Sequence, residues 1–326
     1  MTFETAPRIG MGCWAIGGPF WDGERACGYA GADDATSRAA LRAAWQAGIR
    51  VFDTAAVYGT GHSESLVGEV LADEEDAMIV SKVGLAFDAE SKRITGPRFD
   101  AGYVEAAVDA SRRRLRRDRV DVMLLHLNEL PVADAARAFD AMEALRERGW
   151  IGAYGWSTDF WESARAMAGR NGFEVVQHAM NVFVDAPSMC EAAREGGLAQ
   201  MIRSPLAMGL LAGGYGGGRK VAADDVRNHS AGWNDYFTGR EMTPRYAEML
   251  ERVRELLTTG GRTLGQGALC WLLAKGGTIV PVPGARTPQQ AEENAGALSH
   301  GPLPAEVMAE IETVLDRTPE GPARAR

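Results

Sequence analysis

Short runs of apolar residues alternate along the chain with longer segments in which apolar residues recur every three or four positions. The short runs are typical of buried strands, and the longer segments are typical of helices with one apolar face. The predicted strands are residues 9–14, 50–54, 78–82, 120–126, 151–157, 174–181, 199–204 and 278–283. The clearest predicted helices are residues 33–48, 103–115, 132–149, 159–169 and 187–197. Gly48, Gly149 and Gly196 stand where three of these helices should stop, a common position for glycine.

Strand and helix alternate along nearly the whole chain, which predicts an α/β protein with a single (β/α)8 TIM barrel over residues 1–326. A doubly wound sheet is the alternative, but no predicted strand is followed by the G-x-G-x-x-G pattern that opens a helix. The long segment at about 205–241 has no clear periodicity, so we expect it to cover a cofactor or substrate. Its glycines at 213–218 would allow movement. Tyr215, Trp233, Tyr236 and Phe237 are its candidate contributions to a pocket wall.

Composition narrows the class of protein. The chain has 326 residues, 46% of them apolar, with no long apolar run, so we expect a soluble cytoplasmic protein without a membrane segment. Its formal charge of -9 disfavours a nucleic acid or an anionic membrane as the main partner. The basic segment 111–119 is then expected to be a solvated helix face. The four cysteines form no C-x-x-C pair and no two of the five histidines are four apart, which argues against disulfides and metal.

Polar residues follow the predicted strands at the ends where a barrel holds its chemistry. The segment VFDTAAVYGTGHSE (51–64) supplies Asp53 and Tyr58, and the next two strands end in Lys82 and His126. Later strands end in Ser157 with Thr158 and in Asn181. Because parallel strands converge at one mouth, we expect the first four side chains to meet there.

These four side chains are suited to proton transfer to a carbonyl oxygen. A phenol with a pKa of ~10 is a weak acid at neutral pH, and a neighbouring ammonium such as Lys82 would lower that value. Asp53 would keep Lys82 charged and oriented, while His126 could donate a hydrogen bond to a substrate carbonyl. The set contains no electron donor, so hydride would have to come from a bound cofactor.

Several motifs together resemble the aldo-keto reductases. They are FDTAAVYG with GHSE, MIVSKVG, the strands ending in LLH and GWS, Gln177 with Asn181, SPLAMGLLAGG (204–214) and VPVPGARTPQQAEENAGAL (280–298). Their order and spacing are similar to that family over nearly the whole chain. The resemblance implies a (β/α)8 barrel that uses NADP(H), with Asp53, Tyr58, Lys82 and His126 as its catalytic tetrad.

The resemblance also implies a cofactor site. It assigns Gly12, Cys13, Trp14 and Asp53 to the nicotinamide end and Ser157, Thr158 and Gln177 to the carboxamide. It assigns Ser204, Pro205, Leu206, Gly209 and Leu211 to the pyrophosphate region and Gly284, Arg286, Gln290, Glu293 and Asn294 to the adenosine end. Three positions depart from the family pattern. Thr158 replaces a frequent Asn, and Gln290 replaces an arginine found in some members. Arg203 replaces an aromatic ring that stacks on nicotinamide, a contact its planar guanidinium could also make.

The final strand supports the adenosine end independently. Residues 278–283 lead directly into Gly284–Pro288 and a helix start, which places backbone N–H groups and the Arg286 guanidinium where barrels commonly bind phosphate. Arg286 favours NADP(H) over NAD(H), because a guanidinium can pair with the 2′-phosphate.

The substrate and the class of function stay open at this stage. Trp14, Trp21, Tyr58, His126 and Asn128 are the candidate pocket residues, and they suit either a sugar or an aromatic aldehyde. The sequence predicts a carbonyl reductase or alcohol dehydrogenase, including a sugar dehydrogenase that works mainly in the oxidative direction. The alternative is a non-catalytic NADPH-binding regulatory protein on the same fold. The pattern gives no indication of oligomeric state.

Overall fold

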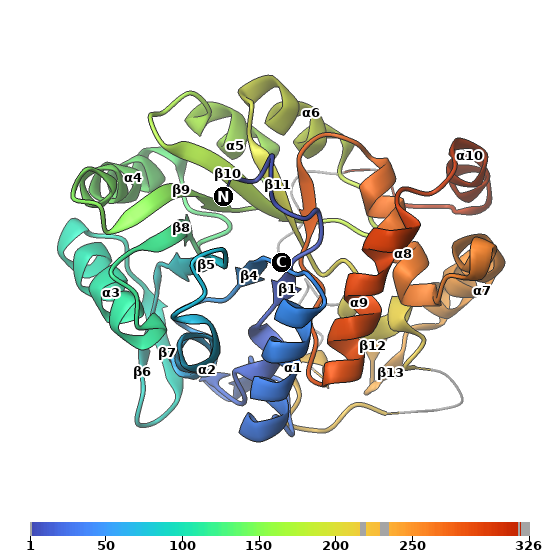
Figure 1. Cartoon of the computed structure of the whole chain (residues 1–326), viewed down its shortest axis with the longest axis horizontal. Helices are drawn as coiled ribbons and strands as arrows, with labels where there is room; N and C mark the ends of the chain where they lie inside the picture. Colours follow the sequence, from blue (N-terminus) through green and yellow to red (C-terminus); the bar gives the residue numbers. More distant parts are fainter. Residues whose placement is uncertain (1, 216–219, 229–234, 319, 321–326) are drawn as a thin grey trace.

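A ring of parallel strands lies at the centre of this computed structural model, which describes residues 2–215, 220–228, 235–318 and 320 (Figure 1). In ring order the strands of the described residues are β1 (Met11–Gly12), β4 (Val51–Asp53), β5 (Met78–Val83), β8 (Val120–Leu125), β9 (Ile151–Ser157), β10 (Phe173–Ala179), β11 (Ala199–Arg203) and β14 (Ile279–Pro281). Gly10 N donates to Pro281 O and Gly12 N to Pro283 O, both at 2.9 Å, and these bonds close the ring. The predicted (β/α)8 barrel is confirmed, and the doubly wound sheet is excluded.

Helices surround this barrel (Figure 1). They are α1 (Asp34–Gln46), α2 (His62–Leu71), α3 (Ala101–Leu115), α4 (Val132–Glu147), α5 (Trp161–Met167), α6 (Pro187–Gly196), α7 (Pro244–Thr258), α8 (Leu264–Ala274), α9 (Pro288–His300) and α10 (Ala305–Val314). Figure 1 shows the early α1, in blue, packed beside the late α9, in red, so the helical layer closes as the strands do. Helices α7 and α10 pack on α8. Helix α6 ends at Gly196, and the glycine in the left-handed conformation that follows it is Gly197, with φ 65°.

Two apolar cores explain the strand sequences. Side chains that point into the barrel, such as Val80, Leu124 and Met201, form an inner core. Those that point outward, such as Ile79 and Leu125, pack against the helices in a larger outer core. Because both faces are covered, β5 is buried at all of its residues, and its first three residues are all apolar.

Two additions lie outside the regular barrel. The first is a small sheet in the order β3 (Arg25–Ala26), β2 (Trp21–Asp22), β7 (Arg93–Pro97) and β6 (Leu85–Asp88). The second is the segment after β11, which contains 3₁₀ turns at Ala207–Ala212 and Val226–Asn228 and a hairpin of β12 (Phe237–Thr238) and β13 (Glu241–Met242). Residues 216–218 and Trp233, which we predicted for its mobile cover, lie outside the described residues.

The aromatic residues of this second addition serve the fold rather than the pocket. Tyr236 is buried and its hydroxyl accepts a hydrogen bond of 2.8 Å from Asn181 Nδ2. The Tyr215 ring packs edge-on against Phe237, with ring centroids 5.1 Å apart. All three aromatic side chains lie outside the cavity wall described below, so their predicted place in that wall is wrong.

The cysteines, the helices and the basic segment relate to the predictions made from composition. Cys13, Cys27, Cys190 and Cys270 are free thiols. In the part of the chain that the structure describes, no helix is both long and apolar enough to cross a bilayer. The basic segment is not only a solvated face, because Arg114 makes an ion pair with the buried Glu64.

Candidate active site

The inward faces of the strands change from apolar to polar toward the C-terminal ends. On β4, Val51 belongs to the inner core and Asp53 follows two positions later; on β5, Lys82 follows Val80 in the same way. Alternate residues of a strand share a face. The polar residues therefore continue the inward face of the barrel and converge at one end of it.

Asp53, Lys82 and Tyr58 form one buried group. Lys82 Nζ lies 2.8 Å from Asp53 Oδ1 and 3.2 Å from the Tyr58 hydroxyl, and it also donates to Thr54 O at 2.7 Å. Lys82 is only 1% exposed, so water cannot solvate its ammonium, and these three contacts take the place of water. An ammonium has three N–H donors, and here each has an acceptor, so the position of the phenol is fixed relative to the charge.

Burial and the neighbouring charge of opposite sign shift the pKa values of these groups in opposite directions. Burial raises the pKa of Tyr58 above that of an ordinary phenol; Lys82 opposes this shift without cancelling it, and Asp53 adds to it. Lys82 does act to lower the pKa of Tyr58, as predicted. The prediction that this pKa falls below the usual value for a phenol is wrong, because burial has the larger effect. Burial alone would lower the pKa of Lys82, but Asp53 and Tyr58 raise it above its usual value, so it stays charged.

His126 stands beside the phenol as a neutral imidazole. Burial, with the nearby charges of Lys82 and Arg203, lowers its pKa well below that of an ordinary histidine. Its ring meets the Tyr58 ring edge-on, with centroids 5.8 Å apart. Its Nδ1 atom is buried without a hydrogen-bond partner among the described residues. A neutral imidazole in this position can donate a hydrogen bond without competing for the proton of the phenol.

An amide links Asp53 to the next polar strand ends. Gln177 Nε2 donates to Asp53 Oδ1 at 2.8 Å, and Ser157 Oγ donates to Gln177 Oε1 at 3.3 Å. Ser157 lines the cavity, whereas Gln177 lies behind the wall. Thr158 is also behind it, because its hydroxyl donates to Asn128 O at 2.7 Å and so holds the loop after β8.

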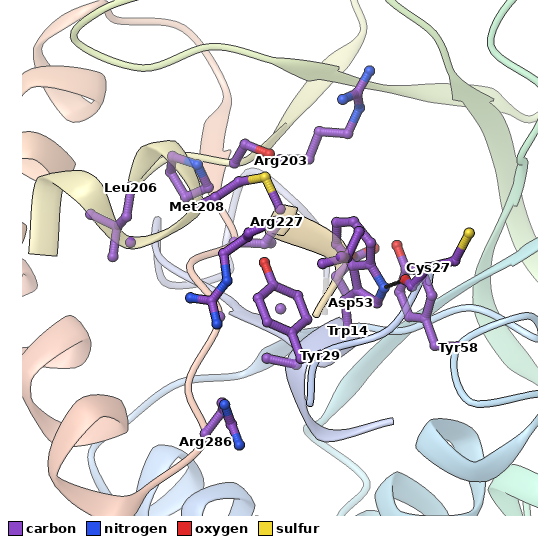
Figure 2. A pocket seen from close by; sticks show the side chains of 18 of the residues that line it. Trp14, Cys27, Tyr29, Asp53, Tyr58, Arg203, Leu206, Met208, Arg227 and Arg286 are labelled. Atoms are coloured by element: carbon purple, nitrogen blue, oxygen red, sulfur yellow. Dashed lines mark hydrogen bonds between the residues drawn. The ribbon is translucent and has the colours of Figure 1, made fainter. Parts of the chain in front are cut away.

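A cavity of about 510 Å³ begins at this group and runs along the barrel mouth. Figure 2 shows Tyr58 and Cys27 at one side, Arg286 at the other, and Trp14, Tyr29 and Arg227 between them. Most predicted site residues form its wall: Gly12, Trp14, Asp53, Tyr58, His126, Asn128, Ser157, Arg203, Ser204, Pro205, Leu206, Gly209, Gly284, Arg286, Gln290, Glu293 and Asn294. The wall therefore reaches from Tyr58 to Arg286.

The remaining predicted site residues lie outside the wall. Lys82 is beneath Tyr58, while Cys13 and Leu211 are fully buried behind the lining residues. Trp21, predicted for the substrate pocket, lies in β2 outside the wall. Its neighbour Phe20 lines the cavity instead, because adjacent residues of an extended chain point to opposite sides.

The segment after β11 approaches the cavity with an unusual backbone. Ser204, Ala207 and Met208 have φ values of 54°, 48° and 53°, and Gly209 has φ 102°. Non-glycine residues rarely adopt this left-handed conformation, and clusters of it are typical of functional sites. Arg203, one residue earlier, forms an ion pair with Asp159. Its guanidinium is therefore held by a carboxylate as well as lying at the wall.

Several wall residues have no local signal in the sequence. The main ones are Cys27 and Tyr29 after β3 and Arg227 in the second addition. Val226 N donates to Gly28 O at 2.9 Å, and Arg227 Nε pairs with Asp225 at 2.6 Å while its guanidinium lies 4.9 Å from the Tyr29 ring centre. Two segments about 200 residues apart in the sequence thus meet across the cavity, and only the assembled fold reveals this pairing.

Comparisons with known proteins identify the family of this chain. The family model described as "Aldo/keto reductase family" matches residues 8–316. The aldo-keto reductase YhdN of Bacillus subtilis is 29% identical, covering 97% of this chain and 93% of its own. The NADH-specific methylglyoxal reductase of Escherichia coli is 26% identical and covers 90% of each chain. A Klebsiella pneumoniae aldo-keto reductase, solved in complex with NADPH, is 22% identical and has a TM-score of 0.71 over 98% of this chain and 95% of its own.

The match to the family model extends over nearly the whole sequence, including every barrel strand. The similar protein of E. coli is NADH-specific, whereas that of K. pneumoniae binds NADPH, so the choice of cofactor varies among these relatives. The chain belongs to the aldo/keto reductase family, whose members are NAD(P)H-dependent oxidoreductases that act on carbonyl compounds.

Proposed function

We propose that this protein reduces a small carbonyl compound with NADPH, with Tyr58 as the proton donor, and that it can also run in the reverse direction. The observation that carries the proposal is the 3.2 Å contact between the Tyr58 hydroxyl and Lys82, whose ammonium is held 2.8 Å from Asp53. A buried cation against a phenol stabilises the phenolate that forms when the proton leaves.

Each of the four residues has a role that its position supports. Tyr58 gives its proton to the substrate oxygen, and Lys82 stabilises the negative charge left on the phenol. Asp53 orients Lys82. His126, neutral and beside the phenol, donates a hydrogen bond that orients the same oxygen. Bound NADPH would supply the hydride that the side chains cannot.

The far end of the cavity fits the phosphate groups of a dinucleotide. Helix α9 begins there at Pro288, with Arg286 just before it and Gln290 and Asn294 in the cavity wall. Helix N-termini and guanidinium groups both attract phosphate. Gln290 Oε1 accepts a hydrogen bond of 2.8 Å from Arg286 N and so orders the backbone beside this guanidinium. We propose that Arg286 binds the 2′-phosphate, which makes NADP(H) the preferred cofactor.

Replacement of the proton donor tests the reaction. We expect Tyr58→Phe to lower the rate of carbonyl reduction by ~10²–10⁴-fold, because the variant keeps the ring but has no proton to give. The cavity shape is retained, so NADPH affinity should change little. Aldehyde reduction can be measured by the loss of NADPH absorbance, and cofactor affinity by titration calorimetry. A variant with a near-normal kcat would show that another group supplies the proton.

Replacement of the guanidinium tests the cofactor. We expect Arg286→Ala to weaken NADPH binding by about 1.5–3 kcal/mol, the range for hydrogen bonds to charged groups, and to leave NADH binding almost unchanged. Dissociation constants of the two cofactors for both proteins give the answer. Equal losses for NADPH and NADH would mean that Arg286 does not contact the 2′-phosphate.

A non-catalytic NADPH-binding protein is the second candidate. The buried Lys82 argues against it, because a buried ammonium costs free energy and contributes nothing to cofactor binding from beneath Tyr58. Turnover of one simple aldehyde with NADPH, or of its alcohol with NADP⁺, separates the two candidates. The ratio of the two rates also shows whether the protein works mainly as a reductase or as a dehydrogenase.

A further inference from the structure

The cavity wall around Tyr58 is built from apolar side chains of the small sheet. Leu85 and Ile94 come from β6 and β7, and Phe20 and Cys27 come from the ends of the β2–β3 hairpin. These side chains pack on a compact apolar cluster that includes the Tyr58 ring itself. Because the proton donor belongs to this cluster, the body of any substrate that reaches the phenol must contact it.

The Trp14 ring beside Tyr58 adds a further apolar surface to this end of the cavity. Trp14 lies against Tyr58 with ring centroids 5.7 Å apart and an angle of 18° between the ring planes. Its indole N–H already donates to Cys27 O at 2.9 Å. The ring therefore contributes mainly its surface to the cavity and can cover a flat or branched apolar group.

The polar groups near the phenol are few and mostly engaged. Arg25 is paired with Asp22, and Asn128 Oδ1 accepts from Asp159 N at 2.8 Å. Asn128 Nδ2 and His126 Nδ1 are the two buried side-chain atoms of this wall that lack a hydrogen-bond partner in the described residues. One or two donors suffice for a carbonyl oxygen, but a chain of hydroxyl groups would leave several hydrogen bonds unmade in this space.

On the basis of the proposed function, we propose that the substrate carries its carbonyl on an apolar body, aromatic or aliphatic, rather than on a polyhydroxylated chain. Leu85 and Ile94 are then specificity-determining residues. The small sheet, which is an addition to the barrel, turns a general carbonyl site into one that excludes sugars because their hydroxyls find no partners here.

A pair of aldehydes with the same carbon skeleton tests this inference. Butanal and D-erythrose both have four carbon atoms, and erythrose adds three hydroxyl groups. We expect kcat/KM, expressed per free carbonyl form, to be at least about 10²-fold higher for butanal, the discrimination an apolar pocket achieves against one added hydroxyl. Equal values, or a preference for erythrose, would overturn the inference but leave the proposed function intact. Failure of both aldehydes, and of their alcohols with NADP⁺, would overturn both.

Variants of the wall add a second, independent readout. We expect Ile94→Ala to lower kcat/KM for benzaldehyde by about 10-fold or more, mainly through a higher KM, because the lost contacts are remote from the reacting atoms. Acetaldehyde, which is too short to fill the wall, should be little affected. Ile94→Asn should narrow the ratio between butanal and erythrose. Thr95→Ala, at the exposed neighbouring position of β7, is the matched control and should behave as the unmodified protein. If Ile94→Ala and Thr95→Ala act alike on benzaldehyde, this wall does not contact the substrate.

Discussion

Lys82 is the residue on which the site depends most. It is a buried cation whose three acceptors come from β4 and the loop that follows it: Asp53, the Thr54 carbonyl and Tyr58. Removal of one partner from a buried ion pair usually lowers the stability strongly, because the remaining charge is left in a medium of low polarity. The same property makes Lys82 the strongest influence on the pKa of Tyr58 among the neighbouring charges, second to burial.

A change at Lys82 should therefore appear in the pH profile. We expect Lys82→Met to move the alkaline limb of carbonyl reduction to higher pH, because burial already raises the pKa of Tyr58 and the variant removes the cation that opposes this shift. Reduction needs the protonated phenol, so its activity persists further into alkali while the overall rate falls. Oxidation needs the phenolate, so it should fall at any fixed pH below the limb. The measurement is kcat/KM against pH in both directions with saturating cofactor.

Two controls accompany this variant. Lys82→Arg keeps the positive charge and should leave the limb close to that of the unmodified protein even where the rate is lower. Asp53→Asn should lose less activity than Lys82→Met, because the ammonium stays but is held less firmly. The three groups titrate as a coupled set, so each profile belongs to the set. An unshifted limb in an active Lys82→Met protein would leave Lys82 as a purely structural strand-end residue.

At the residue scale, the sequence indicates which side chains meet but not their net acidity. Asp53, Lys82 and His126 can be located because strand ends and two-residue alternation are local properties. The net direction of the Tyr58 shift cannot be predicted in this way. It depends on how deeply Tyr58 is buried, and this burial comes from side chains such as Phe20 and Leu85 that other parts of the chain supply.

At the element scale, the contact between α2 and α3 depends on a buried carboxylate. Glu64, with no exposed surface, accepts from Arg114 Nε at 2.7 Å and also from the Ser81 hydroxyl of β5. Arg117 donates to three backbone carbonyls from the last residue of α2 to the residue before β5, at 2.6 to 2.8 Å. These arginines look like surface residues in the sequence because their partners are 40 to 50 residues away.

Loss of Arg114 should destabilise the protein strongly. We expect Arg114→Leu to lower the free energy of unfolding by about 3–5 kcal/mol, because it leaves Glu64 charged and buried without its partner. Arg113→Leu is the matched control: its side chain is mostly exposed and pairs with Asp109 on the surface, so its loss should cost about 1 kcal/mol or less. Urea unfolding of both variants gives the comparison.

A double variant separates the charge effect from lost packing. Glu64→Met combined with Arg114→Leu removes both charges, and apolar replacements of buried pairs are often close to neutral, so we expect most of the stability to return. If Arg114→Leu and Arg113→Leu cost the same, Glu64 does not depend on this ion pair.

The spacing of apolar residues predicts some of the helices and misses others. Helices α1 and α3 bury one face and expose the other, so their apolar spacing predicts them. Helix α8 is buried over nearly its whole length because the barrel lies on one side and α7 and α10 pack on it from outside. A helix covered all round has no apolar stripe, and its sequence loses the periodic signal that would have identified it.

At the scale of the whole molecule, repetition explains what the sequence could predict. The barrel repeats one strand-helix unit, so every strand presents its polar end at the same mouth. The cavity itself does not follow from this repeat. Its walls combine the barrel with the β2–β3 hairpin, the β6–β7 hairpin and the segment after β11, and contacts such as Val226 to Gly28 join parts distant in sequence.

The molecule should also lose stability in mild acid, because burial keeps two histidines among the described residues neutral, His126 and His178. Burial lowers the pKa of His178, only partly opposed by Asp159 and Gln200, and burial lowers that of His126 further still. In the unfolded chain both return to about 6.5. As pH falls below that value, the unfolded state binds protons that the folded state does not, so the free energy of unfolding falls by up to ~1.4 kcal/mol per pH unit for each histidine.

A variant of His178 isolates one of these contributions. His178 lies outside the cavity wall and contacts Gln200 at 3.1 Å, so its replacement should leave the proposed reaction chemistry in place. We expect His178→Gln to reduce the slope of unfolding free energy against pH, by up to ~1.4 kcal/mol per unit below about pH 6.5. Urea unfolding at several pH values measures the slope, and the difference at about pH 8, where the histidines are neutral in both states, reports the packing change alone. A variant whose curve runs parallel to that of the unmodified protein down to about pH 5 would mean that His178 takes up its proton in the folded state as readily as in the unfolded chain.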